Sequence, residues 1–225
     1  MTEGRVLAID TSGTSALVAL GDGAGALLTE RRWPAGYRHG EELLTRIDEM
    51  LTTAGVPIAE LSGIIIGTGP GAFTGLRVGL ATAKALARGL SVPIAGVPTS
   101  EALLGAAGLA GAFEGMQAVL LLPAGPSDRV VVAGGSATLL RGGEEPELNA
   151  ETTLVAVDLT GRAPAAALAL GVQAESGLAA SLVRLGVERL ASGGDDVARL
   201  VPEYVSLPRG VPVMKGEVRW SRDHR

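Results

Sequence analysis

The order of apolar and polar residues divides the first hundred positions into short strands and longer helices. Residues 41–54 repeat apolar side chains at helical spacing and stop before Gly55, a residue that favours the end of a helix. A second helix is predicted up to residue 90, and a third follows Thr99 or Ser100, either of which suits an N-cap. Runs typical of buried or half-buried strands stand at 6–9, 16–20, 26–31, 63–67 and 92–97. This order predicts a mixed sheet flanked by helices.

The second half of the chain also combines predicted strands with a helix, but its apolar patterns are less regular. One long helix is predicted at 176–191, where leucines recur at helical spacing. Strands are predicted at 118–122, 129–133, 137–140 and 154–157. We therefore predict an α/β protein with two lobes, each a mixed sheet flanked by helices, at 1–104 and 105–225. The second lobe ends in a basic tail.

Composition narrows the classes of function. Hydrophobic residues make up 47% of the chain and charged residues 19%, so a packed core is expected. Aromatic residues make up only 3% and the net charge is -5, which disfavours direct binding of a nucleic acid. The chain has no cysteine, which excludes disulfides and thiolate chemistry. No apolar stretch approaches the roughly 20 residues that a membrane span needs, and a cytoplasmic protein is expected.

A glycine-rich stretch, GTGPGAFTGLRVGLATAKALARGL at 67–90, is the strongest local pattern. Gly69-Pro70-Gly71 predicts a tight turn with a positive φ at Gly71, and Thr74 predicts a helix N-cap. The N–H groups of residues 71–74 would then converge on an anion at the helix N-terminus. The spacing is neither that of a Walker loop nor that of a dinucleotide-binding loop. Close packing explains the glycines equally well, and the sequence leaves both interpretations open.

The first hairpin offers a second candidate for phosphate binding. Asp10-Thr11-Ser12-Gly13-Thr14, between two strands, resembles the first phosphate turn of actin-like ATPases and sugar kinases. An ordinary solvated β-turn gives the same pattern. The candidate contacts to a phosphate, or to what remains of such a site, are Asp10, Ser12, Gly13, Gly69 and Gly71.

Four segments together resemble the TsaB family, also called YeaZ: LAIDTSGTSALVAL at 7–20, RHGEELLTRIDEML at 38–51, GTGPGAFTGLRVGLATAKALA at 67–87 and IAGVPTSEAL at 94–103. The resemblance implies an actin-like fold of two lobes and a role in forming threonylcarbamoyladenosine beside the anticodon of tRNA. It also implies a heterodimer with the catalytic subunit TsaD, formed through first-lobe helices, which recruits the ATPase TsaE. Contact with tRNA would be indirect.

Departures from the related catalytic subunit favour a chain without catalysis of its own. TsaD carries a metal-binding His-x-x-x-His helix, whereas the only histidines here are His39 and His224. The second phosphate turn of actin-like ATPases has an acid, whereas the strand at 118–122 leads into Pro123-Ala124-Gly125-Pro126. No metal and no cofactor are therefore expected. The segment Pro202–Val205 is similar to the Pro-x-Tyr ending of the family.

Two helices of the first lobe are the predicted partner surface. Gly75, Gly79 and Ala83 recur every four residues and would permit close approach, while Arg77 and Lys84 would contact the partner or be ordinary solvated charges. The full predicted set is Leu43, Ile47, Gly75, Leu76, Arg77, Gly79, Leu80, Ala83 and Lys84. We thus read the chain as a non-catalytic partner of TsaD. The alternatives are a weak actin-like ATPase or kinase that uses Asp10 and residues 67–75, and a self-associating protein whose homodimer uses the same helices.

Overall fold

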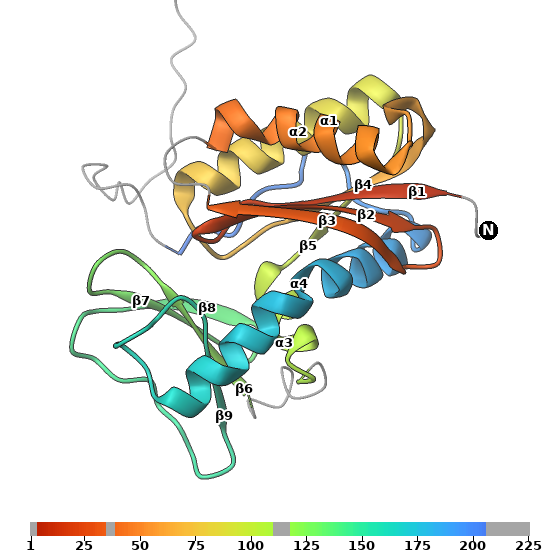
Figure 1. The fold of residues 1–225 in the computed structure, drawn as a ribbon. Coiled ribbons are helices and arrows are strands. Elements are labelled where there is room, and N and C mark those ends of the chain that lie inside the picture. The colour runs from red at the N-terminus through yellow and green to blue at the C-terminus, as the bar shows by residue number, and fades with distance from the viewer. Residues whose placement is uncertain (1–3, 35–38, 110–117, 206–225) are drawn as a thin grey trace, which may run out of the picture.

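The computed structural model describes residues 4–34, 39–109 and 118–205, which form two α/β lobes (Figure 1). The basic tail and His224 lie outside the described residues. The elements of the first lobe are β1 (Arg5–Asp10), β2 (Ser15–Asp22), β3 (Leu27–Pro34), α1 (His39–Ala54), η1 (Ile58–Glu60), β4 (Leu61–Gly67), α2 (Phe73–Leu90), β5 (Ile94–Val97) and α3 (Thr99–Ala106). The remaining elements are β6 (Ala118–Pro123), β7 (Arg129–Ala133), β8 (Ser136–Leu140), β9 (Thr153–Ala156) and α4 (Ala165–Ala191).

The two sheets share one topology. The first has the strand order β3-β2-β1-β4-β5, and the second has the order β8-β7-β6-β9. In each sheet three antiparallel strands are followed by a parallel strand, so that β6–β9 correspond to β1–β4 without the fifth strand. The predicted α/β class, with two mixed sheets flanked by helices, is confirmed.

Alternate residues of the first sheet bury their side chains in two separate cores. Leu7, Ile9 and Ile66 pack with α1 and α2 on one face, whereas Ala8 and Ile65 pack with α3 and α4 on the other. Figure 1 shows α1 and α2 above the first sheet and α4 below it. The aliphatic core expected from the composition is thus divided by a sheet buried on both sides.

Helix α4 joins the two lobes. Near its start Gly171 lies against the backbone of Ala156 in β9, and near its end Gly186 lies against Ile65 in β4. The sequence predicted this helix only from residue 176, but it begins at Ala165. The early part was missed because its alanines and Gly171 gave no clear helical face; the glycine is there because a Cβ would collide with the strand.

The length of α4 also corrects the expectation about membrane spans. Among the described residues α4 is the one helix long and apolar enough to cross a membrane by length and composition. Of its most apolar window, 44% is buried inside the molecule, against both sheets. The buried residues of the helix contribute to the core between the two sheets.

Candidate functional site

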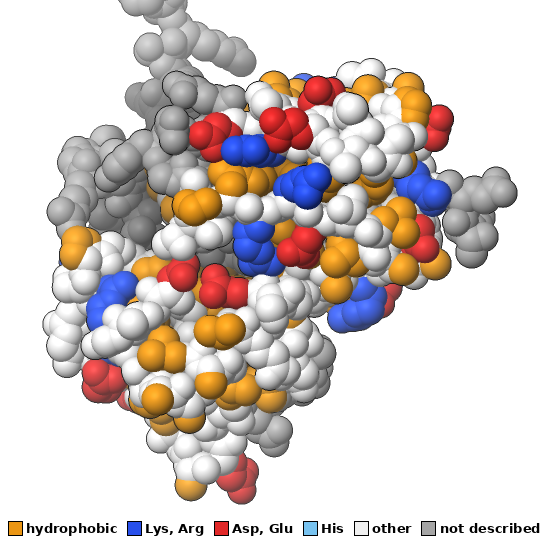
Figure 2. Space-filling view, viewed as in Figure 1, with side chains coloured by type: hydrophobic (Ala, Val, Ile, Leu, Met, Phe, Trp, Pro, Cys, Tyr) orange, Lys and Arg blue, Asp and Glu red, His pale blue; other side chains and the backbone are white. Residues whose placement is uncertain are grey.

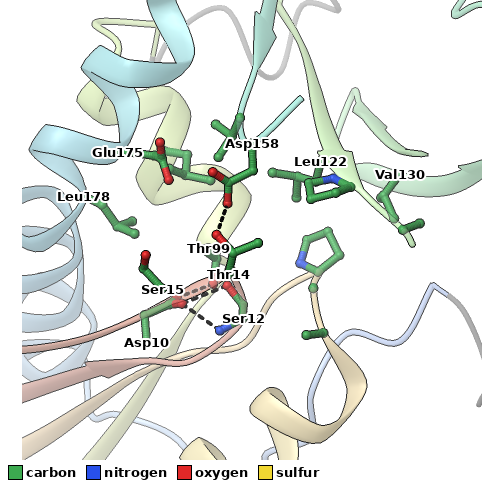
Figure 3. Close-up of a pocket in the computed structure, with 18 of the residues that line it drawn as sticks. Asp10, Ser12, Thr14, Ser15, Thr99, Leu122, Val130, Asp158, Glu175 and Leu178 are labelled. Carbon is green, nitrogen blue, oxygen red and sulfur yellow. Dashed lines mark hydrogen bonds between the residues drawn. The ribbon is translucent and has the colours of Figure 1, made fainter. Parts of the chain in front are cut away.

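A cleft of about 660 Å³ lies between the lobes (Figure 3). The turn between β1 and β2, together with the glycine loop before α2, forms the first-lobe wall. The end of β6 and the loop after it form much of the opposite wall. The volume is in the range of small-molecule sites.

Asp10 lies at the base of the cleft with both carboxylate oxygens in hydrogen bonds. The N–H and the hydroxyl of Ser12 donate to Oδ1 at 2.9 and 2.8 Å, and the hydroxyl of Thr99 donates to Oδ2 at 2.6 Å. Burial raises the pKa of Asp10, although the bonds from Thr99 and Ser12 and the charge of Arg32 lower it. The carboxylate therefore joins the end of β1 to the start of α3.

Glycines around Asp10 allow backbone and side chains to approach closely. A Cβ at Gly67 would collide with the Asp10 carboxylate and lie 2.8 Å from the Thr99 hydroxyl. A Cβ at Gly71 would lie 2.7 Å from the Cβ of Ser12, and one at Gly79 would collide with the hydroxyl of Thr11. Packing thus accounts for these three glycines without a ligand.

Two local predictions about the glycine loop are wrong. The positive φ, +98°, occurs at Gly69, which precedes Pro70 through a cis peptide bond, and not at Gly71. Helix α2 begins at Phe73 after the N-cap Ala72, so Thr74 lies inside the helix and does not cap it. The N–H of Ala72 donates to the carbonyl of Ser12 at 2.7 Å. One of the four N–H groups predicted to bind an anion is therefore already engaged.

The cap predicted for α3 is also wrong. The N-cap is Pro98, and no side chain caps the helix. Thr99 is the first helical residue, and its hydroxyl donates to Asp10 and accepts from the N–H of Gly69 at 3.1 Å. The Thr99 hydroxyl, which suggested an N-cap, therefore takes part in the hydrogen bonds around Asp10 instead.

The opposite wall is mainly apolar. Leu122 and Val130, 7% and 4% exposed, face the cleft, as does Ala124. Arg162 holds the adjoining loop in place, because it donates to the carbonyls of Gly125 and Pro126 at 3.0 and 3.1 Å. Apolar side chains therefore occupy the end of β6, where the second phosphate turn of an actin-like ATPase would have an acidic residue.

Charged side chains gather where the two lobes meet (Figure 2). The hydroxyl of Thr14 donates to Asp158, a hydrogen bond that bridges the cleft. Burial and, to a lesser extent, the charge of Asp158 raise the pKa of Glu175, while Arg32 lowers it. Sequence reasoning missed Arg32, Asp158 and Glu175, because they come from three elements far apart in the chain.

The predicted partner residues divide into a buried group and an outer group. Arg77 is exposed on α2, and Lys84 is half-buried there. The others pack inside the first lobe: Leu43, Ile47, Gly75, Leu76, Gly79, Leu80 and Ala83. A partner bound to α1 and α2 would therefore meet the opposite sides of these helices.

An aromatic cluster at the start of α2 was also missed. The rings of Phe73 and Tyr204 lie 5.0 Å apart, and the guanidinium of Arg77 lies 3.9 Å from the centre of the Phe73 ring. The Nε–H of Arg77 donates to the hydroxyl of Tyr204 at 3.1 Å. The Pro-x-Tyr segment was the available signal, but sequence alone did not show what Tyr204 contacts.

Metal ligands are not clustered in the part of the chain that the structure describes. Within residues 4–34, 39–109 and 118–205, no group of three or more His, Cys, Asp or Glu residues could hold a metal ion. Both oxygens of Asp10 accept hydrogen bonds from within the protein.

Comparisons with known proteins agree with this architecture. A family model described as TsaD, tRNA N6-adenosine threonylcarbamoyltransferase, matches residues 34–157. TsaB of Escherichia coli, named for tRNA threonylcarbamoyladenosine biosynthesis, is 35% identical over 95 residues, or 42% of this chain and 40% of that protein. YeaZ from Pseudomonas aeruginosa superposes with a TM-score of 0.65 at 24% identity, covering 89% of this chain and 99% of that one. The chain belongs to the TsaB (YeaZ) family.

The TsaB-type match is confined to part of the length of the curated relatives. A tRNA N6-adenosine threonylcarbamoyltransferase of Geotalea uraniireducens is 48% identical over 63 residues, which are 28% of this chain and 18% of that enzyme. In these matches the chain spans less than half of the relative's own length. The YeaZ superposition extends the likeness of fold, though not of function, over both lobes.

Proposed function

We propose that the chain is a non-catalytic subunit of the cytoplasmic system that forms threonylcarbamoyladenosine in tRNA. Its role would be to bind and support a TsaD-type enzyme, with a TsaE-type ATPase joining the pair. The observation that carries the non-catalytic part is the state of Asp10. Its two oxygens accept three hydrogen bonds from Ser12 and Thr99, so the acid that would hold a metal–phosphate group connects two elements of the fold instead.

The opposite wall supports the same proposal. Phosphoryl transfer needs cationic or metal-held stabilisation of charge on both sides of the phosphates. Here Leu122, Ala124 and Val130 face the first-lobe turn, and the nearby Arg162 donates to backbone carbonyls. A weak ATPase or kinase would have to rearrange both walls.

The outer sides of α1 and α2 suggest how a partner binds. Helix α1 contains four acidic residues and one arginine, whereas α2 contains Arg77, Lys84 and Arg88 and no acid. A partner that presents the same two helices in the reverse order would place acid against base in both contacts. A TsaD-type chain would present both helices, since the TsaD family model matches residues 34–157, and so would a second copy of this chain. The heterodimer is the proposal, and a homodimer is the competing outcome.

Reconstitution tests the functional proposal. Purified TsaD, TsaE, ATP, tRNA and the threonylcarbamoyl-AMP adduct are combined with and without this chain, and modified adenosine is measured by mass spectrometry. We expect modification to require this chain, and the Asp10→Asn variant to support it at the parent rate. Loss of ATP turnover by the isolated chain in Asp10→Asn would instead favour the enzyme.

Charge reversal on α2 tests the partner surface. We expect Arg88→Glu to weaken the complex with TsaD by about tenfold or more, because a complementary charge becomes a repulsive one. Arg141→Glu, the same change on an exposed loop of the second lobe, is the matched control and should bind as the parent does. Buried positions such as Gly79 and Leu80 are unsuitable probes, because their substitution would disrupt the lobe itself. Equal binding by Arg88→Glu and Arg141→Glu would contradict this surface.

A further inference from the structure

The described chain ends in a segment, residues 195–205, that returns across the first lobe after α4. At its start the N–H of Asp195 donates to the carbonyl of Ile94 at 2.7 Å, and its carboxylate accepts from the N–H of Gly96 at 2.7 Å. The segment thereby covers β5, the edge strand of the first sheet. We call residues 195–205 the strap.

The middle of the strap lies against the glycine loop. Leu200 approaches Gly96 so closely that a Cβ there would lie 2.5 Å from the leucine side chain. The N–H of Glu203 donates to the carbonyl of Thr68 at 2.8 Å. The strap therefore follows the edge of the first lobe toward the start of α2.

Tyr204 attaches the end of the strap to α2. Its ring lies against Phe73, and its hydroxyl accepts the hydrogen bond from Arg77, whose guanidinium covers the Phe73 ring. Two of the six aromatic residues of the chain meet here. We call Phe73, Arg77 and Tyr204 the latch.

The next residue, Val205, lines the cleft. It packs beside the core cluster that contains Leu122 and Val130 of the second lobe. Adjacent residues lie only about 3.8 Å apart along the chain, so Val205 cannot leave the cleft far while Tyr204 is held. The bridge from Thr14 to Asp158 is a separate contact between the lobes.

We propose that the strap is a gate on the cleft between the lobes, and that the latch keeps the gate closed. The attachments up to Glu203 hold the strap on the first lobe whether or not the latch is made. The latch alone controls the last step, the position of Val205 in the wall of the cleft. Release of Tyr204 opens the cleft to molecules from solution without unfolding either lobe.

A thiol reporter tests the gate, since the chain has no cysteine of its own. Val130→Cys places a single thiol in the wall of the cleft, at a position 4% exposed. We expect Tyr204→Ala and Arg77→Gln each to raise the rate of maleimide labelling of this thiol by about tenfold, the change expected from loss of a cation–π contact and a hydrogen bond. The matched control Val201→Ala, on the same strap at a position 67% exposed, should leave the rate unchanged.

A second reporter separates opening of the gate from general loosening. Ala83→Cys, at a position 0% exposed within the first-lobe core, should stay protected in all of these variants. Equal labelling of Val130→Cys with and without the latch would overturn the proposal. A rate increase at both reporters would overturn it as well, because the latch would then be a contribution to stability and not a gate.

One consequence rests on the proposed function. Arg77 lies on the outer side of α2, so a partner bound there would withdraw it from Tyr204 and open the gate. Adding TsaD to the Val130→Cys protein should then raise labelling as Tyr204→Ala does. A complex that forms without such a rise would overturn this step alone, whereas failure to form a complex would overturn the proposed function and leave the gate intact.

Discussion

The two walls of the cleft have corresponding positions in sheets of the same topology, yet they are built in different ways. The first-lobe wall is packed until backbone and side chains touch, with Gly67 against Asp10 and Gly71 against Ser12. On the second-lobe wall, Gly125 has a positive φ of +106° and nothing within 4 Å of the place where a Cβ would stand. There Arg162 ties the loop through carbonyls alone.

The difference lies in what holds each wall in shape. Asp10, Ser12, Thr99 and the N–H of Gly69 form a buried hydrogen-bond network, so loss of one side chain leaves another polar group without its partner. The loop at 123–126 has no such network and no acid. The first wall is therefore held by buried hydrogen bonds of its own, whereas the second is held mainly by Arg162 from outside the loop.

The largest effect is expected from Gly67→Ala in the first wall. The new methyl group would collide with the Asp10 carboxylate and crowd Thr99, so that buried hydrogen bonds must break or the strand must move. We expect a loss of about 3 kcal/mol in the free energy of unfolding, at the upper end of overpacking effects. Urea denaturation of the parent and the variant measures this difference in the free energy of unfolding.

Gly89→Ala is the control for this substitution. Gly89 lies in α2 with nothing within 4 Å of its added Cβ, and alanine is the better helix former, so stability should rise by about 0.5–1 kcal/mol. If Gly67→Ala lowered the free energy of unfolding by less than about 1 kcal/mol, the first wall would be able to accommodate the added methyl group, and the prediction would be wrong.

Local patterns predicted most of the first lobe. The apolar runs gave β1, β2, β4 and β5 within three residues at each end, and the leucine face of the first helix gave α1. These signals are local, because a strand or a helix face repeats within a few residues. Where tertiary contacts override them, as with the hydroxyl of Thr99, the prediction of a helix cap was wrong.

The site itself was only partly predictable. Asp10 and Ser12 were both named as candidate phosphate contacts because they stand in one turn, but their hydrogen bonds to each other were not predicted. Arg32, Asp158 and Glu175 meet only because α4 brings the two lobes together, and Tyr204 reaches Phe73 across more than a hundred residues. Contacts between segments so far apart in the sequence produce no local sequence pattern from which they could be predicted.

The charge of Asp10 should make the first wall sensitive to pH. Burial raises its pKa above the ordinary 3.8, so between that pH and the folded-state value the folded chain binds more protons than the unfolded one. The free energy of unfolding should therefore fall as pH rises through this interval, by at most about 1.4 kcal/mol per pH unit from this group. Asp10→Asn should reduce that slope in urea titrations from pH 4 to 7.

Two other carboxyl groups provide the background to this measurement. Burial also raises the pKa of Glu175 and of Glu203, so a residual slope of the same sign should remain in Asp10→Asn. Parallel slopes for the parent and Asp10→Asn would contradict this prediction, because the hydrogen bonds to Asp10 would then balance the effect of its burial on the pKa.

The smallest effect is expected where the walls meet. Thr14→Val keeps the branched shape but removes the hydroxyl that donates to Asp158 across the cleft. Because this bond is exposed, and because α4 already packs against both sheets, we expect a loss of at most about 1 kcal/mol in the free energy of unfolding. Thr138→Val, on an exposed position of β8, is the matched control and should change stability by less than about 0.5 kcal/mol. A loss near 3 kcal/mol for Thr14→Val would contradict this expectation. It would show that the hydrogen bond from Thr14 to Asp158, and not the packing of α4, holds the two walls of the cleft together.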